Sequence, residues 1–294
     1  MPTAEPLSSI MKLTLTIVVF LLCLSCSDNA DKETAPSIYE LLQGDWTTEK
    51  YAREHFGVNH FNFNVNDSIF TMFSAYSDSA KFKIQGNLLT VLDSSHTYYM
   101  GTHQKYEIVK ITNTELTLIA KSNYVRKRLR NYDWDNDTLK FEKIAKKNSV
   151  VPTKIRFSSS GCYGSCPRLK LTVDDSRTIK FYGLGFTSIE GPYSGKISKR
   201  EYDLILKQIN QIDLDSLKTA YSASWTDDQT RSLTIETSDS TIKTYAYGTY
   251  LEPIELTILL DNLIDLYKRS DLKPDDSFHR DNSMRNYFKE FDPY

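Results

Sequence analysis

The stretch His60-Phe61-Asn62-Phe63-Asn64-Val65 alternates polar and apolar residues along the chain. A period of two places the apolar side chains on one face of a β-strand and the polar ones on the other. The same alternation recurs at 81–85 and 138–142. From Leu42 to Ile144 we therefore expect about eight strands in an all-β meander or barrel. Helix is expected in this region only as a turn near Ser37–Leu42.

The residues that open this region add a family resemblance. Leu42-Gln43-Gly44-Asp45-Trp46 resembles the Gly-x-Trp opening of lipocalin-like domains. In those domains the glycine starts the first strand and the tryptophan plugs the base of the barrel. The later segments 106–109, 116–118 and 139–141 are similar to hairpins of the small lipocalin-like domains of Gram-negative lipoproteins. The resemblance implies a lipocalin-like β-domain over residues 38–146.

Five apolar residues would line a ligand cavity if this barrel encloses one: Trp46, Phe61, Phe63, Phe82 and Ile84. An eight-stranded barrel can hold one small ligand, or it can be filled by its own side chains. Packing in a closed core accounts for all five residues equally well. Both interpretations therefore stay open at this point.

The N-terminal region combines a basic residue, a short apolar run and a cysteine. Met11-Lys12 precedes the run Leu13–Leu24, which ends at Ser25-Cys26. A run of roughly twelve residues is too short to span a bilayer as a helix and suits a signal peptide. Residues 1–26, with translation starting at Met11, resemble a bacterial lipoprotein signal peptide. That resemblance implies cleavage before Cys26 and lipidation of its thiol.

Two alternatives to lipidation are an ordinary secretory peptide and a short membrane anchor. Ser27, and not aspartate, follows the cysteine, which in Gram-negative sorting implies the outer membrane. The polar residues 27–37 are expected to be a tether. The predicted first partner is thus a membrane, through a lipid anchor. The predicted location is the cell outer membrane, facing the periplasm or the surface.

Composition excludes several other classes. Charged residues make up 25% of the chain and hydrophobic ones 40%, which is typical of a folded globular protein. The net charge of −2 gives no electrostatic case for nucleic-acid binding. The histidines show no metal-ligand spacing, and no nucleophile, base and acid group together. We therefore expect no cofactor, no metal and no catalytic activity.

After the polar seam Lys146–Ser149 the pattern changes, and we expect a second domain over residues 150–270. Short strands precede a helix that begins at the capping box Ser198-Lys199-Arg200-Glu201. A hairpin follows, and then a second helix opened by Pro253. This order predicts an α+β domain in which an antiparallel sheet carries two helices on one face. Residues 271–294 are expected to form a polar tail.

The second domain also carries a family motif. Gly161-Cys162-Tyr163-Gly164-Ser165-Cys166-Pro167 resembles the Cys-x-Gly-x-Cys-Pro signature of an uncharacterised family of bacterial domains. Two further segments of that family follow in the same order, at 191–193 and at 221–227. The activity of the family is unknown. The resemblance therefore implies a domain boundary and no mechanism.

The two cysteines of this motif admit more than one role. If Cys23 leaves with the signal peptide and Cys26 takes lipid, Cys162 and Cys166 remain to pair with each other. Gly164 between them can adopt a positive φ, so the loop can curl until the two Cα atoms come within bonding range. The alternatives are a copper(I) site on two soft thiolates and a redox site.

The segment Lys121–Arg130 is strongly basic and is followed by three aspartates. Such neighbours are typical of a solvated hairpin whose opposite charges offset each other. Contact with anionic lipid head groups is the alternative.

Together these features predict a non-catalytic, lipid-anchored protein of the cell envelope. The first hypothesis is capture of a small apolar ligand in the β-domain. The second is an envelope assembly or stress module that contacts other proteins and needs no pocket. The third is copper or redox handling at Cys162 and Cys166. A cavity would favour the first, and a filled barrel with exposed apolar residues would favour the second.

Overall fold

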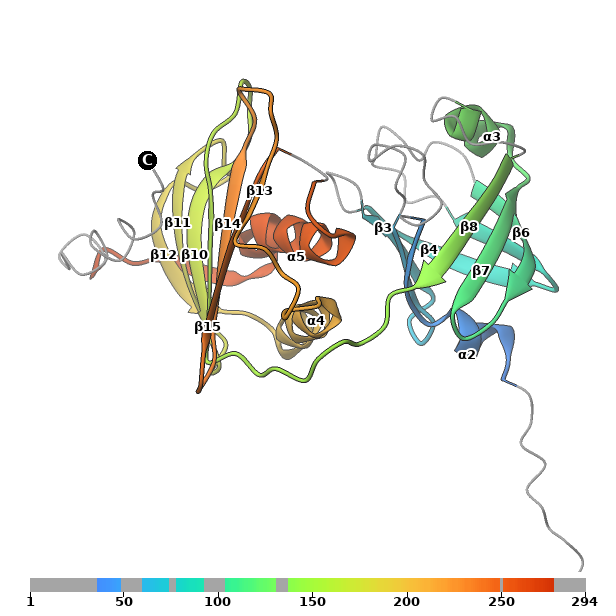
Figure 1. Ribbon diagram of the computed structural model, residues 1–294, viewed down its shortest axis with the longest axis horizontal. Helices are drawn as coiled ribbons and strands as arrows, with labels where there is room; N and C mark the ends of the chain where they lie inside the picture. The colour runs from blue at the N-terminus through green and yellow to red at the C-terminus, as the bar shows by residue number, and fades with distance from the viewer. Residues whose placement is uncertain are drawn as a thin grey trace, which may run out of the picture. The chain divides into compact units, whose positions relative to one another are not determined.

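The computed structural model describes residues 36–48, 60–73, 78–92, 104–130, 137–248 and 251–277. Residues 38–294 belong to one compact unit that contains two β-sheets (Figure 1). The predicted signal peptide, Cys26, most of the predicted tether and most of the predicted tail lie outside the described residues. Within the described ranges, no helix is both long enough and apolar enough to cross a membrane.

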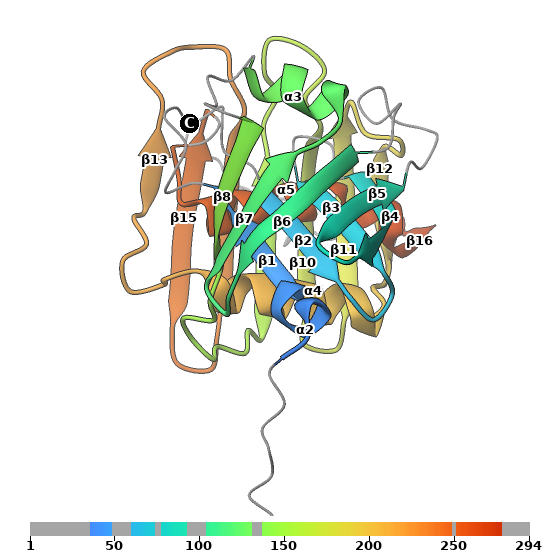
Figure 2. The same ribbon diagram turned by 90° about the vertical axis from the view of Figure 1, so that its right-hand side faces the viewer.

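The first sheet is a closed barrel of eight antiparallel strands in chain order (Figure 2). Each strand pairs with the next, and the ring closes where β1 pairs with β8, with Trp46 opposite Lys143. The expected eight-stranded meander is thereby confirmed. The strands are β1 (Gly44–Thr47), β2 (His60–Asn64), β3 (Ile69–Phe73), β4 (Asp78–Gln85), β5 (Leu88–Leu92), β6 (Gln104–Ile111), β7 (Glu115–Ala120) and β8 (Thr138–Lys143).

A short helix, α2 (Ile38–Leu42), precedes the barrel at the expected position. Gly44 follows with a φ of 120°, a conformation that favours glycine, and begins β1. The indole N–H of Trp46 donates to the carbonyl of Leu42 at 2.8 Å, and both residues are fully buried. The Gly-x-Trp segment therefore turns the chain from α2 into the first strand and places the indole ring in the barrel core.

The hairpin predicted at Lys121–Arg130 is wrong, because Asn123–Arg130 forms a helix, α3. The run contains neither glycine nor proline, and its lysines and arginines are good helix formers. Val125 is buried in the barrel core, and Nε of Arg126 lies 3.3 Å from Oδ2 of Asp137. The burial of Val125 packs this helix against the barrel. In Figure 2, α2 and α3 lie at opposite ends of the barrel.

The second sheet has eight strands in the order β13-β15-β14-β9-β10-β11-β12-β16. The expectation of a wholly antiparallel sheet is corrected, because β13 pairs with β15 in parallel. Strand β15 forms a hairpin with β14 and lies between β14 and β13. Strand β13 therefore pairs with β15, to which it runs parallel. The strands are β9 (Lys154–Ser159), β10 (Arg168–Asp174), β11 (Thr178–Gly185), β12 (Gly191–Lys196), β13 (Ala220–Ser222), β14 (Thr230–Glu236), β15 (Thr241–Tyr247) and β16 (Asp271–Pro274).

Two helices, α4 (Lys199–Gln211) and α5 (Ile254–Asp265), pack on one face of this sheet (Figure 1). The predicted cap of α4 is confirmed, since Oγ of Ser198 accepts the N–H of Glu201 at 3.1 Å. The other half of the capping box does not form. The carboxylate of Glu201 instead accepts from Nε of Arg269 at 3.0 Å, in the 3₁₀ turn η4 (Leu266–Arg269) that follows α5.

The expected polar tail begins instead with a strand, because β16 pairs with β12 at the edge of the sheet. Leu272 packs against the core of this domain. A Cβ atom on Gly195 would lie 1.8 Å from the carbonyl oxygen of Asp271, so only glycine allows the two strands to approach. The glycine in β12 and the lone leucine in the polar segment together explain why the chain pairs here.

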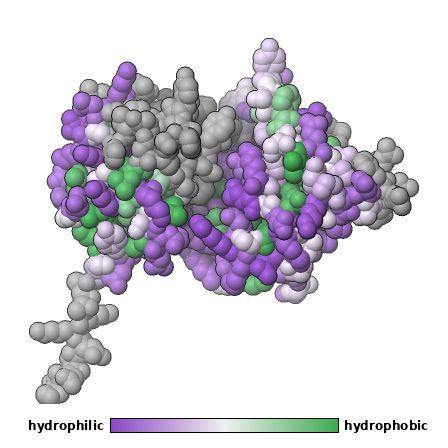
Figure 3. All heavy atoms as spheres, turned by 180° about the vertical axis from the view of Figure 1, so that it is seen from behind, coloured by the Kyte–Doolittle hydropathy of each residue, from purple (hydrophilic) through white to green (hydrophobic). Residues whose placement is uncertain are grey.

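The barrel has one hydrophobic core, and the second sheet with its two helices has another. A small third cluster is formed by Ile144, Ile254 and Ile258. On the face seen in Figure 3, hydrophobic residues form small groups separated by hydrophilic ones.

Candidate functional site

The barrel interior contains the predicted cavity residues. The ring centroid of Phe61 lies 4.7 Å from that of Phe141 and 4.8 Å from that of Phe70. Phe63 lies 5.2 Å from Phe70 and 5.5 Å from Phe82. These are direct ring-to-ring contacts of the kind that pack an aromatic core. The buried members of the predicted set are Trp46, Phe61, Phe63 and Phe82, while Ile84 is partly buried and packs against them.

A surface depression lies on the other side of the barrel wall. Its lining comes from the outward positions of β4, β5 and β6 and includes none of the five predicted residues. If Trp46 closes the base of the barrel, the loop 93–100 is expected to control access at the opposite mouth, but this loop lies outside the described residues. The lining residues of the depression are Lys83, Gln85, Leu88, Thr90, Leu92 and Lys105.

The two motif cysteines are at disulfide distance, with their Cα atoms 5.6 Å apart. Gly164 between them has a φ of 147°, as its position in the tight loop predicts. Sulfurs joined to each other cannot serve as a pair of thiolate ligands, so this geometry agrees with a structural staple and not with copper(I) binding. The loop projects Tyr163 into solvent, with 91% of its surface exposed.

Three loops meet at this end of the second sheet. The N–H of Tyr163 donates to the carbonyl of Asp227 at 2.8 Å, which joins the cysteine loop to the β13–β14 loop. The side-chain amide of Gln229 donates to the carbonyls of Ser160 and Pro167. A Cβ atom on Gly161 or Gly185 would contact the side chain of Arg168, which therefore lies between the cysteine loop and the β11–β12 loop.

The same loops expose two further aromatic side chains, Phe186 at 60% and Trp225 at 44%. Phe186 has a φ of 54°, which is uncommon for a bulky residue and costs about 1 kcal/mol or more. A strained and exposed phenylalanine adds nothing evident to the stability of the domain. We call Tyr163, Phe186, Trp225 and Arg168 the aromatic end.

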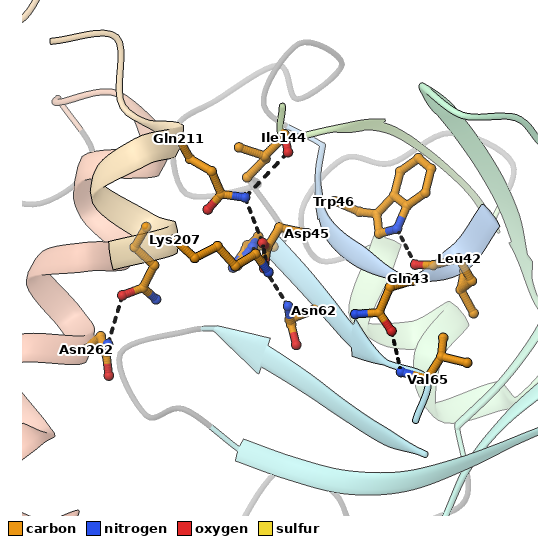
Figure 4. A network of polar contacts seen from close by, with 12 residues as sticks. Leu42, Gln43, Asp45, Trp46, Asn62, Val65, Ile144, Lys207, Gln211 and Asn262 are labelled. Carbon is orange, nitrogen blue, oxygen red and sulfur yellow. Dashed lines mark hydrogen bonds and ion pairs between the residues drawn. The ribbon is translucent and has the colours of Figure 1, made fainter. Parts of the chain in front are cut away.

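A second feature is a buried polar cluster around Asp45 (Figure 4). Strand alternation places Trp46 inside the barrel and Asp45 on its outer wall, opposite Asn62. Asp45 is only 5% exposed, because α4 covers it. Its Oδ1 accepts from Asn62 at 2.6 Å, and its Oδ2 accepts from Gln211 at 2.7 Å and lies 2.5 Å from Nζ of Lys207.

The charge of Asp45 is strongly favoured in this setting. Burial alone raises the pKa of Asp45, but His60, whose Nε2 lies 3.5 Å from Oδ1, and the charge of Lys207 outweigh it and hold the pKa well below its usual range. Nearby, Lys143 lies over the Trp46 ring at 4.8 Å, and burial lowers the pKa of this lysine. Every one of these contacts fixes a charge in place, and the cluster therefore fastens α4 to the barrel.

A third polar group lies in the core of the second domain. Arg231 of β14 is 4% exposed and places its two terminal nitrogens 2.7 Å from Oδ1 of Asp261 and 2.5 Å from Oε1 of Glu252. Burial raises the pKa of Asp261 to about 6, while Arg231 lowers it and Glu252 raises it further. Both carboxylates are engaged by one guanidinium, so this group ties α5 to the sheet.

Sequence reasoning missed both the aromatic end and the Asp45 cluster. Large aromatic residues within turn-forming sequence, Gly185-Phe186-Thr187 and Ser224-Trp225-Thr226, are a signal that could have identified the first. The Asp45 cluster depends on contact between α4 and the barrel wall, which no local sequence pattern predicts. Among the described residues, no group of three or more potential metal-ligating side chains comes together.

Comparison with known proteins gives a family match for one of the two domains. A family model described as a domain of unknown function (DUF6438) matches residues 153–267. The match runs from β9 into η4 and includes the cysteine loop and both helices, which confirms the expected uncharacterised domain. No curated protein and no solved structure matches the chain.

Proposed function

We propose that this chain is a non-catalytic, lipid-anchored protein of the cell envelope that acts as a protein-interaction module. The aromatic end of the second domain is its contact surface. The observation that carries the proposal is the exposure of Tyr163, Phe186 and Trp225 on adjoining loops, two of which flank Arg168. Tyrosine, tryptophan and arginine dominate the binding energy of protein interfaces.

The construction of these loops supports the proposal. The Cys162–Cys166 staple and the hydrogen bonds of Gln229 hold the loops before any partner arrives. A preformed contact surface loses less conformational freedom on binding. A Cβ atom on Gly248 would lie 3.1 Å from the Trp225 ring, so this glycine leaves room for the indole.

The ring contacts of Phe61 and Phe63 inside the barrel support this proposal over capture of an apolar ligand, since packed rings leave less space for one. The lipid anchor rests on the N-terminal sequence alone. A Cys26→Ala variant is expected to appear in soluble fractions or to remain unprocessed, and a mature-sized variant that still partitions with membranes would contradict the anchor.

The interaction is tested by cross-linking in the native cell envelope. The variants Tyr163→Ser, Phe186→Gly and Trp225→Ser should each weaken capture of a discrete protein by tenfold or more. Val109→Ser and Val151→Ser, at exposed apolar positions elsewhere, are the matched controls. Phe186→Gly should at the same time stabilise the fold by about 1 kcal/mol, because glycine adopts positive φ without strain. Equal capture by all five variants would overturn the proposal.

A further inference from the structure

The face of the second sheet opposite α4 and α5 is lined by basic side chains. Leu169, Leu171, Phe181 and other apolar residues point toward the helices and are buried. Strand alternation therefore directs the intervening residues of β9 to β12 and β14 to β16 toward the opposite face. We call that face the cationic face.

Strand register aligns the basic residues in cross-strand rows. Thr172 pairs with Lys180 on one side and with Arg156 on the other. On the side of Lys180, the row continues through Ser194 to Lys273. On the side of Arg156, it continues through Thr234 to Lys243. Four basic residues therefore lie along one row: Lys273, Lys180, Arg156 and Lys243.

The adjoining row adds one lysine and two tyrosines. Lys170 pairs with Tyr182, and through Ser158 and Ser232 the row continues to Tyr245. None of the paired positions in these two rows, all of them in the described part of the chain, is acidic. The two rows together thus carry five basic residues.

Acidic residues lie at the margins of these rows. Glu236, one row further along, forms an ion pair with Arg156. Asp275, just after β16, has its pKa lowered by hydrogen bonds with Ser277 and Ser194 and by the charge of Lys180. The row of Glu236 also carries Asp174 and Asp271, beside Lys154 and Lys196. The three rows and Asp275 together hold seven basic and four acidic residues, so basic charge still exceeds acidic charge on this face.

The shape of the face indicates what it can bind. Ser158, Thr172 and Thr234 are short and buried at its centre, while Lys180, Lys243 and Lys273 are exposed around them. Eight strands at about 4.8 Å spacing span roughly 35 Å, which is a broad surface. Arg156, the only arginine in the two rows, already pairs with Glu236. The rows therefore offer no further arginine for bidentate recognition of nucleic-acid phosphates.

We propose that the cationic face binds an anionic phospholipid bilayer. Lysines act as point charges that attract a negatively charged leaflet without a fixed geometry. The half-buried Tyr182 and Tyr245 carry rings of the kind that lie at the head-group level. The proposal is independent of the protein-interaction function and of the lipid anchor, because neither involves this face.

Lysine footprinting of the full chain on vesicles tests it, and the readout does not depend on how the N-terminus is attached. The probes are vesicles of phosphatidylcholine alone and vesicles in which about a third of the lipid is phosphatidylglycerol. Acylation of Lys180, Lys243 and Lys273 should fall at least threefold only on the anionic vesicles, and high salt should restore it. Lys83, Lys105 and Lys140, exposed on barrel strands, should stay equally reactive on both.

A matched pair of variants gives the second measurement. Changing Lys180, Lys243 and Lys273 to glutamine in the full chain should lower the partition coefficient on anionic vesicles at least tenfold relative to neutral ones. The same change at Lys83, Lys105 and Lys140 should leave that ratio unchanged. Equal labelling on both vesicle types, equal effects of the two triple variants, or tight binding of a soluble polyanion with no protection on vesicles would each overturn the proposal.

Discussion

Nζ of Lys207, in helix α4, lies 2.5 Å from Oδ2 of Asp45, in the first strand of the barrel. The two residues are far apart in sequence, and Gln211, one turn further along α4, hydrogen-bonds the same oxygen. The aspartate is the middle residue of the Gly44-Asp45-Trp46 segment that opens the barrel. One short segment therefore directs a ring into the barrel core and a buried charge toward the second domain.

Removing the lysine should weaken the fold. Lys207→Ala leaves the Asp45 carboxylate buried with only neutral donors and His60 beside it, and we expect a loss of about 1–2 kcal/mol in unfolding free energy. Lys199→Ala is the control, since Lys199 on the same helix pairs with Asp203 in solvent and should cost at most about 0.5 kcal/mol. Urea denaturation measures both. Equal losses would show that the Asp45 contact contributes nothing particular.

The pH dependence of this contact follows from the lowered pKa of Asp45. A carboxyl group whose folded pKa lies below its ordinary value of 3.8 stabilises the fold above that pH and loses its contribution as pH falls further. The stability difference between the wild type and Asp45→Asn should therefore be largest near neutral pH and shrink below about pH 4. A difference that stays constant down to pH 2 would contradict the assigned charge.

The cysteine loop should stabilise the second domain through the unfolded state. Closing so short a loop contributes about 2 kcal/mol on the chain-entropy model, so Cys162→Ser should lower the melting temperature without changing the folded structure. Non-reducing peptide mapping should find Cys162 joined to Cys166. Ser165→Ala, between them and exposed, serves as the control. Free thiols or stoichiometric copper in freshly purified protein would contradict the staple.

The buried group around Arg231 predicts a pH effect of the opposite sign. The pKa of Asp261 rises from 3.8 to about 6, so the folded protein binds a proton that the unfolded chain has released. Stability should then fall as pH rises from 4 to 6, by at most about 3 kcal/mol. Asp261→Asn removes that slope, and Asp215→Asn, on the surface, keeps it. If the stability of Asp261→Asn fell with pH as steeply as that of the wild type, a group other than Asp261 would be responsible for the titration.

The fold was predictable from sequence where it rests on local periodicity. The alternation at His60–Asn64 predicts β2, and Ser198 predicts the start of α4, because both depend on neighbours within a few residues. The basic run at Asn123–Arg130 misled because its charge pattern drew attention away from Val125, which is buried in the barrel core. The strand β16 was missed because its pairing depends on Gly195, far along the chain.

The candidate site was less predictable than the fold. The motif cysteines were identified because the spacing of two residues on one loop is itself local. The aromatic end was not, since Tyr163, Phe186 and Trp225 come from three loops that only the sheet brings together. Asp45 was read as the variable position of a barrel motif, and its partners on α4 lie in another domain. Sequence periodicity reports which face a residue takes and not what covers that face.

The packed barrel core yields the last prediction, which also decides between the ligand and interaction hypotheses. Phe61 contacts Phe63, Phe70, Tyr106 and Phe141, so Phe61→Ala should cost about 3–5 kcal/mol and leave a cavity. An environment-sensitive apolar dye should bind saturably to the folded variant and not to the wild type or to the surface control Lys140→Ala. A dry apolar cavity of this kind takes up small apolar molecules readily. Saturable binding by the folded wild type would show that its barrel already has room for a ligand, and apolar capture would then replace the filled-core interpretation.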